Sequence, residues 1–364
     1  MRKPFVRMVA LIVALSAGLL GNALAGQKGR MVYTMSNATS GNAVLVFEQR
    51  GDTLVPAGSF PTQGTGSGGG LGNQGAIALS EDGETLLAVN AGSNEVSVFQ
   101  VHEHGLRLTD KVSSGGVSPI SIAIHEDWVY VLNGGGTGNI TGFLLTKHDT
   151  LTPIPGSTRS LSGQATAPAQ IEFNPEGDTL VVTEKATQII DTYTVDEDGV
   201  ATGPFSQPSS GATPFGFSFN KRGVLIVSEA FGGRANASAV SSYVLRKGVL
   251  GLRSGSVPDF QSAACWIVVT RNGKFAYTSN TGSNNISSYR VGRDGTLTLL
   301  EAVAAATGAA PIDMALSGNS KTLYVLNAVA RTIDVFRVDR WNGELTLLSS
   351  LSGLPAGANG LVAR

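Results

Sequence analysis

The chain has 364 residues and a formal net charge of −1 at pH 7, and its charged residues, 15% of the total, are scattered along the sequence. This balance gives no electrostatic footprint for a nucleic acid or an anionic membrane. Cys265 is the single cysteine, so no internal disulfide can form and a structural zinc site is not expected.

Residues 1–25 are predicted to form a secretory signal peptide. Basic residues near the start precede an apolar stretch at 8–20 that is too short to span a bilayer comfortably. Ala23-Leu24-Ala25 has the A-x-A pattern of a cleavage site. We therefore expect a secreted or periplasmic mature protein without a membrane span, which forms one domain over 26–364. An uncleaved anchor is the alternative.

The rest of the chain repeats a unit of four short strands. The unit is clearest at 167–193, where β-branched and apolar residues alternate and the turn Asn174-Pro-Glu-Gly177 separates the first two strands. Turn glycines equivalent to Gly177 recur with a period of about 45 to 50 residues. The second strands of the units are expected at Met31–Met35, Thr85–Val89, Trp128–Leu132, Thr179–Thr183, Val224–Ser228, Phe275–Ser279 and Leu323–Leu326.

This period predicts an all-β fold, a seven-bladed β-propeller with four antiparallel strands per blade. The N-terminal unit lacks a first strand, and Gly360–Ala363 at the C-terminus supplies a surplus one. The last strand should therefore join the first blade and close the ring, which leaves no open edge. A pair of β-sandwiches does not explain the surplus strand, and a β-helix requires shorter repeats.

The residue that closes each second strand marks one face of the propeller, near its axis. These residues are Ser36, Asn90, Asn133, Glu184, Glu229, Asn280 and Asn327. The two glutamates interrupt an asparagine pattern in neighbouring blades, and carboxylates near a narrow axis cost desolvation unless they are paired or used. We therefore predict that Glu184 and Glu229 are catalytic. The alternative is that all of these side chains cap loops by hydrogen-bonding to backbone amides.

Connections from a fourth strand to the next first strand lie on the same face. Together with the asparagines they give the predicted substrate-binding set: Asn90, Asn133, Gln170, Phe215, Trp266, Asn280, Asp313 and Asn327. Phe215 and Trp266 either bind an organic ring or plug the channel. The glycine-rich run at 64–75 is a weak nucleotide motif, because no helix pattern follows it. The histidines fall on the opposite face, which disfavours Ser–His–Asp catalysis.

Three stretches carry a resemblance to a known family. APAQIEFNPEGDTLVVTEKATQIIDTY (167–193), TPFGFSFNKRGVLIVSEA (213–230) and LYVLNAVARTIDVFRVD (323–339) resemble the lactonase family of seven-bladed propellers. That family includes bacterial 6-phosphogluconolactonases and fungal carboxymuconate cyclases. The last stretch is also similar to the YVTN repeats of surface-associated propellers. The resemblance covers roughly residues 30–364.

The resemblance implies an active site with a polar–Glu pair at the end of a second strand, which matches Thr183-Glu184 or Ser228-Glu229. It also implies a basic–His pair before a first strand, and this chain departs from that pattern with Ala169-Gln170. A phosphorylated lactone also requires cations, and the nearest candidates are Lys185 and Arg234. A phosphogluconolactone substrate is therefore not favoured.

We expect the protein to be a monomer. The sequence supports two hypotheses about its function. In the first, Glu184 or Glu229 is the general base of a lactone hydrolase or cyclase, each glutamate raising the pKa of the other, and Asn133 and Asn280 stabilise an oxyanion. In the second, the protein is a non-catalytic propeller that binds an envelope component. A minor alternative places Ca²⁺ on the axis between the two glutamates and asparagine side chains. No other cofactor is expected.

Overall fold

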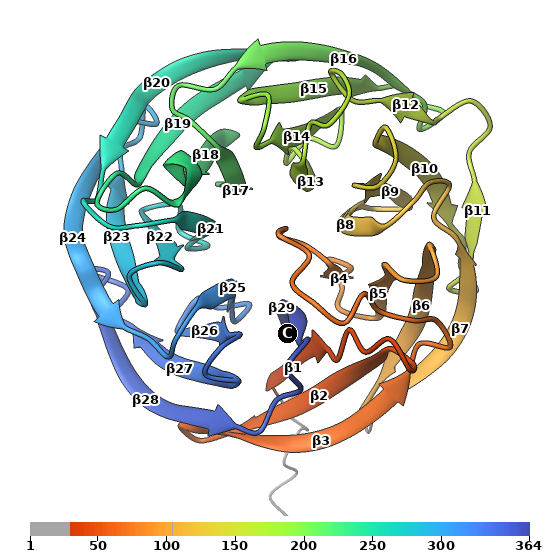
Figure 1. Cartoon of the computed structure of the whole chain (residues 1–364), viewed down its shortest axis with the longest axis horizontal. Coiled ribbons are helices and arrows are strands. Elements are labelled where there is room, and N and C mark those ends of the chain that lie inside the picture. The colour runs from red at the N-terminus through yellow and green to blue at the C-terminus, as the bar shows by residue number, and fades with distance from the viewer. Residues whose placement is uncertain (1–29, 104) are drawn as a thin grey trace, which may run out of the picture.

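The computed structural model describes residues 30–103 and 105–364, so the predicted signal peptide lies outside the described residues. The described chain forms seven sheets arranged in a ring around a central axis (Figure 1). Each sheet is an antiparallel meander of four strands, except that the fourth strand of blade 3 is divided into two short pieces. The predicted seven-bladed propeller is confirmed.

The strands of each blade follow in order from the axis outward. Blade 1 consists of β29 (Asn359–Ala363), β1 (Arg30–Met35), β2 (Ala43–Arg50) and β3 (Thr53–Pro61), and blade 2 of β4 (Ile77–Leu79), β5 (Thr85–Asn90), β6 (Glu95–His102) and β7 (Gly105–Ser113). Blade 3 consists of β8 (Pro119–His125), β9 (Trp128–Asn133), β10 (Asn139–Leu145), β11 (Leu151–Pro153) and β12 (Arg159–Ser160), and blade 4 of β13 (Pro168–Phe173), β14 (Thr179–Glu184), β15 (Ile189–Val195) and β16 (Ala201–Pro208).

The remaining blades repeat this order. Blade 5 consists of β17 (Pro214–Phe219), β18 (Val224–Glu229), β19 (Ala239–Arg246) and β20 (Val249–Pro258), and blade 6 of β21 (Ala264–Val269), β22 (Phe275–Asn280), β23 (Asn285–Val291) and β24 (Leu297–Ala306). Blade 7 consists of β25 (Pro311–Leu316), β26 (Thr322–Asn327), β27 (Thr332–Val338) and β28 (Leu345–Ser352). Among the described residues, no helix is long and apolar enough to cross a membrane.

The core lies between neighbouring blades, because both faces of the second strands are covered. Every residue of β5, β14, β18, β22 and β26 is buried, so each of these strands has a run of three or four core-forming side chains and ends on a buried polar residue. Buried tyrosines on several second strands also donate across a blade boundary. Tyr130 donates to the carbonyl of Gly199 at 2.7 Å, Tyr277 to that of Gly343 at 2.8 Å, and Tyr324 to Oε1 of Gln49 at 2.5 Å.

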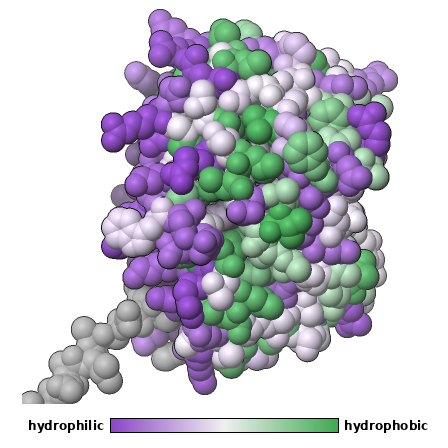
Figure 2. Space-filling model, turned by 90° about the vertical axis from the view of Figure 1, so that its left-hand side faces the viewer, coloured by the Kyte–Doolittle hydropathy of each residue, from purple (hydrophilic) through white to green (hydrophobic). Residues whose placement is uncertain are grey.

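The outermost strands face solvent on the rim. Figure 2 shows the flank that carries β20 and β24, where apolar and polar side chains are mixed. Val249, Leu252 and Val303 are exposed there, and scattered apolar side chains of this kind are normal on a protein surface.

The ring closes through β29, as the surplus C-terminal strand predicts. It pairs antiparallel with β1 in the register Val32–Ala363, Tyr33–Val362 and Thr34–Leu361. Leu361 is 4% exposed and packs in the core cluster that joins blades 7 and 1. The closure therefore combines backbone hydrogen bonds with core burial.

Replacement of Leu361 by alanine is expected to lower the free energy of unfolding by about 2–5 kcal/mol, because it leaves a cavity at the closure. The matched control is Leu347→Ala on β28, where the side chain is 56% exposed and the expected change is about 0.5 kcal/mol or less. Urea denaturation of both variants measures the difference. Equal destabilisation would contradict a buried closure.

Candidate functional site

The residues that close the second strands lie where the sequence predicts, and all of them are buried. Asn90, Asn133, Glu184, Glu229, Asn280 and Asn327 are each 0% exposed, and Ser36 is 8% exposed. Each of the six fully buried side chains hydrogen-bonds to the third strand of its own blade, to the segment that leaves the preceding blade, or to both. Four of them, Asn90, Asn133, Glu184 and Glu229, therefore join consecutive blades at one end of the sheets.

The asparagines show the common pattern. Asn90 donates through Nδ2 to Ser97 Oγ at 2.8 Å, and its Oδ1 accepts from Thr62 Oγ1 at 2.7 Å. In blade 7, Asn327 Nδ2 donates to Asp334 Oδ2 at 2.8 Å.

The asparagines of blades 3 and 6 donate through Nδ2 in the same way. Asn133 donates to the Ser114 carbonyl at 3.2 Å, and Asn280 donates to Ser287 Oγ at 2.8 Å. These amide nitrogens, the predicted oxyanion donors, thus already have acceptors within the fold.

Glu184 is the blade 4 version of this position. Its Oε1 accepts from the backbone N–H of Ser162 at 2.9 Å, and its Oε2 accepts from the hydroxyls of Ser162 and of Thr187, the latter at 2.5 Å. Asp191 on β15 shares the Ser162 N–H at 3.0 Å. Burial, and then the neighbouring Glu184 carboxyl, raises the pKa of Asp191 to about 7.

Glu229 closes the second strand of blade 5 and has different surroundings. Its Oε1 accepts from the backbone N–H of Gly211 at 2.8 Å, whereas its buried Oε2 accepts no hydrogen bond of good geometry from residues 30–103 and 105–364. Burial raises the pKa of Glu229, and the nearby hydroxyls of Ser256 and Ser241 partly offset this effect. A Cβ at position 211 would collide with Oε2, so a larger residue there would displace the Glu229 carboxylate.

The sequence analysis expects each glutamate to raise the pKa of the other, and the structure shows a different arrangement. Burial rather than Glu184 raises the pKa of Glu229, and the carboxyl coupled to Glu184 is Asp191 of the same blade. Sequence reasoning missed Asp191. The signal was present, because the third residue of every third strand from blade 2 to blade 7 is polar or acidic: Ser97, Thr141, Asp191, Ser241, Ser287 and Asp334.

The mouth of the propeller on this face is covered by the glycine-rich loop at 64–75. Figure 1 shows the segment between β3 and β4 reaching into the centre of the ring. Trp266 Nε1 donates to the carbonyl of Asn73 at 2.6 Å, and Gln74 exchanges two hydrogen bonds with the backbone of Ile267 at 3.0 and 3.2 Å. The loop of blade 1 is thus fixed to the first strand of blade 6.

Phe215 and Trp266, the predicted aromatic pair, contact each other. Their ring centroids are 5.1 Å apart, and the side chains are 8% and 4% exposed. Lys185 Nζ lies 4.6 Å from the Phe215 centroid, donates to the carbonyl of Pro168 at 3.0 Å, and also donates to that of Gly72. Burial lowers the pKa of Lys185 to about 8. The pair, the lysine and the loop are therefore in contact with one another at this face.

Gln170 and Asp313 connect adjacent first strands. Gln170 Oε1 accepts from the Phe217 N–H at 2.7 Å, and its Nε2 donates to the Phe217 carbonyl at 2.9 Å. Burial raises the pKa of Asp313 well above its ordinary value, against hydrogen bonds from the N–H groups of Met314 and Leu361. Sequence analysis did not single out Glu172, which accepts from Gln170 Nε2 at 2.9 Å and whose pKa burial raises to about 8.

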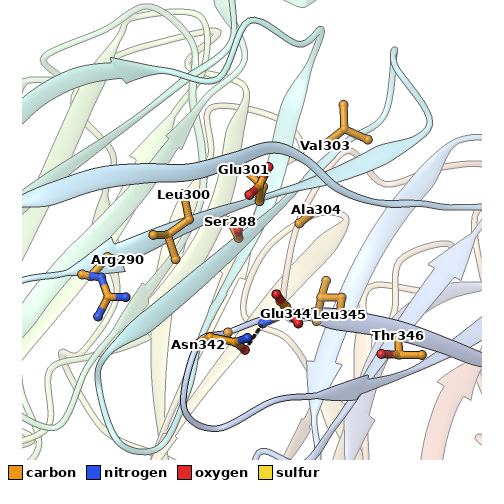
Figure 3. Close-up of a pocket in the computed structure, with 11 residues that line it drawn as sticks. Ser288, Arg290, Leu300, Glu301, Val303, Ala304, Asn342, Glu344, Leu345 and Thr346 are labelled. Atoms are coloured by element: carbon orange, nitrogen blue, oxygen red, sulfur yellow. Dashed lines mark hydrogen bonds between the residues drawn. The ribbon is translucent and has the colours of Figure 1, made fainter.

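The described chain also has a pocket of about 500 Å³ on the flank between blades 6 and 7 (Figure 3). Arg290, Glu301 and Glu344 line it, so its charges have both signs, and it includes none of the predicted site residues. In the part of the chain that the structure describes, no three histidine, cysteine or acidic side chains are grouped closely enough to hold a metal ion. The axial Ca²⁺ ion and the monomeric state stay predictions.

Comparison with known proteins places the chain in a family. The model of the family "Lactonase, 7-bladed beta-propeller" matches residues 24–147 and 250–358. A 6-phosphogluconolactonase of Bacillus subtilis is 23% identical over 305 residues, which cover 78% of this chain and 86% of that protein. A 6-phosphogluconolactonase of Serratia proteamaculans is 42% identical over 60 residues, which cover 16% of this chain and 18% of that protein.

Solved structures share the fold. A putative 6-phosphogluconolactonase from Bacteroides fragilis has a TM-score of 0.73 at 19% identity, over 92% of this chain and 98% of that chain. The periplasmic gluconolactonase of Pseudomonas aeruginosa has a TM-score of 0.71 at 15% identity, over 91% of this chain and 98% of that chain. The chain is a seven-bladed propeller with a polar, loop-covered mouth, and it belongs to the lactonase family.

The carboxyl pair of blade 4 predicts a pH dependence of stability. The pKa of Asp191 is about 7 in the folded chain and about 4 in an unfolded chain. The folded state therefore binds this proton more tightly, and the resulting stabilisation is complete below about pH 4 and is lost as the pH rises toward 7. Asp191→Asn should flatten this part of the profile, measured as urea midpoints from pH 4 to 8.

Glu184→Gln provides the matched comparison. An amide replaces the carboxyl that helps to raise the pKa of Asp191, so the pH window in which stability falls should move to lower pH. Identical profiles for the wild type and both variants would contradict the carboxyl pair.

Proposed function

We propose that this chain is an exported lactonase-family enzyme that hydrolyses or isomerises a small lactone with a glutamate as general base. Support comes from the family, from relatives named as 6-phosphogluconolactonases and a periplasmic gluconolactonase, and from the predicted signal peptide at 1–25. Lys185 already donates to two backbone carbonyls, so a lactone without a phosphate group is the favoured substrate.

One observation favours Glu229 over Glu184 as the base. A general base needs a lone pair that can reach the proton it removes. Both carboxylate oxygens of Glu184 accept hydrogen bonds from the protein, whereas Oε2 of Glu229 accepts none of good geometry from the part of the chain that the structure describes. Burial also raises the pKa of Glu229, which makes its carboxylate a stronger base.

The proposed hydrolysis balances without a cofactor. The Glu229 carboxylate removes a proton from a water molecule as the water oxygen bonds to the lactone carbonyl carbon. The ring C–O bond of the tetrahedral intermediate then breaks, and Glu229 returns the proton to the departing ring oxygen. The product is an open-chain hydroxy acid. Because Glu229 is 0% exposed, the substrate reaches it only if the segment around Gly211 moves.

The second candidate function is a non-catalytic propeller that binds an envelope component. Two observations favour it. The glycine-rich loop at 64–75 occupies the mouth through hydrogen bonds to blades 4 and 6. In addition, Ala169-Gln170 replaces the basic–His pair that the family resemblance implies, and Gln170 is engaged with Phe217.

Glu229→Gln is expected to lower kcat on a lactone substrate by about 100-fold or more, because the amide cannot accept the proton. Glu184→Gln should lower kcat by less than about 10-fold, because its carboxyl is already engaged. Hydrolysis of sugar and non-sugar lactones by the mature protein, followed by pH-stat titration, measures these rates. Activity should fall with decreasing pH as Glu229 becomes protonated, at a pH above the ordinary glutamate pKa.

Glu197→Gln, in an exposed turn on the opposite face of blade 4, is the control and should retain wild-type turnover. Wild-type activity in Glu229→Gln would contradict the role of Glu229. Absence of turnover by the wild type on the whole panel would favour the binding propeller, and saturable binding to an envelope fraction would then be measured.

A further inference from the structure

The face opposite the covered mouth carries the turns between first and second strands, and their charges are segregated by blade. In blades 2, 3 and 4 the charged residues of these turns are all acidic: Glu81, Asp82, Glu84, Glu126, Asp127, Glu176 and Asp178. In blades 5, 6 and 7 they are all basic: Lys221, Arg222, Arg271, Lys274 and Lys321. These turns therefore place acidic side chains on one part of the face and basic side chains on another, although Arg364 lies beside Asp82 and the turns between third and fourth strands add charges of both signs.

A pocket of about 310 Å³ lies within the basic part of the face. Lys221 from blade 5, Arg271 from blade 6 and Arg340 from blade 7 line it, and no carboxylate does. Its other lining residues are mostly polar: Thr270, Asn272, Asn319, Ser320 and Val338. Three blades thus contribute one cation each to a single cavity that also offers amide and hydroxyl groups.

These three cations are not neutralised by the described part of the chain. None of them takes part in an ion pair there. Arg271 donates to the carbonyl of Gly318 at 3.3 Å. The guanidinium carbon of Arg340 lies 4.4 Å from the centroid of the Trp341 ring. Asp339, next to Arg340 in sequence, accepts from the backbone N–H groups of its own turn. Cations gathered in one cavity repel each other, and a bound anion would relieve this repulsion.

We propose that this pocket binds a small phosphate-bearing anion. Arginine guanidinium groups match phosphate oxygens in a bidentate geometry, and a lysine adds a point charge. The acidic turns of blades 2 to 4 on the same face repel an extended polyanion, so the ligand is small. The site lies on the opposite face from Glu229, and the proposal is independent of the lactonase mechanism.

The test is the direct binding of inorganic pyrophosphate and of a sugar phosphate to the mature protein, measured by isothermal titration calorimetry at low and at physiological ionic strength. Saturable binding that weakens with added salt is expected. In Lys221→Ala/Arg340→Ala, affinity should fall by about 10-fold or more, because two charge-assisted contacts are lost. The tighter of the two probes indicates whether the ligand is a free phosphate anion or a sugar ester.

The matched control is Arg246→Ala/Lys247→Ala, which removes the same charge from an exposed turn of blade 5 on the same face but outside the pocket. The control should bind both probes about as tightly as the wild type. Equal losses in the two double variants would overturn the proposal, because they would indicate a diffuse electrostatic effect. Absence of binding by the wild type at millimolar concentrations would overturn it as well. Thermal unfolding of each variant verifies that it is folded.

Discussion

The structure depends on a buried hydrogen bond that recurs from blade to blade. A polar side chain at the end of each second strand is shielded from water, so it must find its partners within the protein. In blade 2, Asn90 bonds to Ser97 and to Thr62, and in blade 7, Asn327 bonds to Asp334. In blades 2 to 5 one partner lies on the segment that leaves the preceding blade, so this requirement helps to fix the spacing of these blades at one end of the ring. The apolar core packs neighbouring blades against each other, and the pairing of β29 with β1 closes the ring.

Glu184 and Glu229 occupy that structural position in blades 4 and 5, and they differ in the hydrogen bonds that their carboxylates accept. Glu184 shares Ser162 with Asp191 and accepts hydrogen bonds on both carboxylate oxygens. The buried Oε2 of Glu229 accepts none of good geometry from the described residues, although the hydroxyls of Ser256 and Ser241 lie near this carboxylate. A buried carboxylate oxygen without a well-formed hydrogen bond is costly for stability. At the equivalent positions of three other blades, Oδ1 of Asn133, Asn280 and Asn327 also accepts no hydrogen bond from the described residues. The family fold alone does not assign an activity, because propellers support many functions. The difference between the two carboxyl groups is therefore the observation on which the enzymatic proposal rests.

The opposite face shows that composition can conceal a strong charge distribution. Lysines and arginines are scattered along the sequence, yet the propeller brings Lys221, Arg271 and Arg340 from three blades to one cavity. Successive turns between first and second strands lie beside each other around the ring. A run of acidic turns followed by a run of basic turns therefore places side chains of opposite charge on two parts of one surface.

The sequence by itself determined the blades, their order, the closing strand and the position of Glu184 and Glu229, because these depend on strand periodicity and turn chemistry within about 50 residues. It also indicated that Phe215 and Trp266 belong to one cluster. Only the tertiary structure decided that Asp191 is the carboxyl partner of Glu184 and that the loop at 64–75 covers the mouth. Trp266 and Asn73 are joined by a hydrogen bond although they are 193 positions apart. Local periodicity cannot specify such contacts, because side-chain direction and loop path are set by the packing of whole blades against each other.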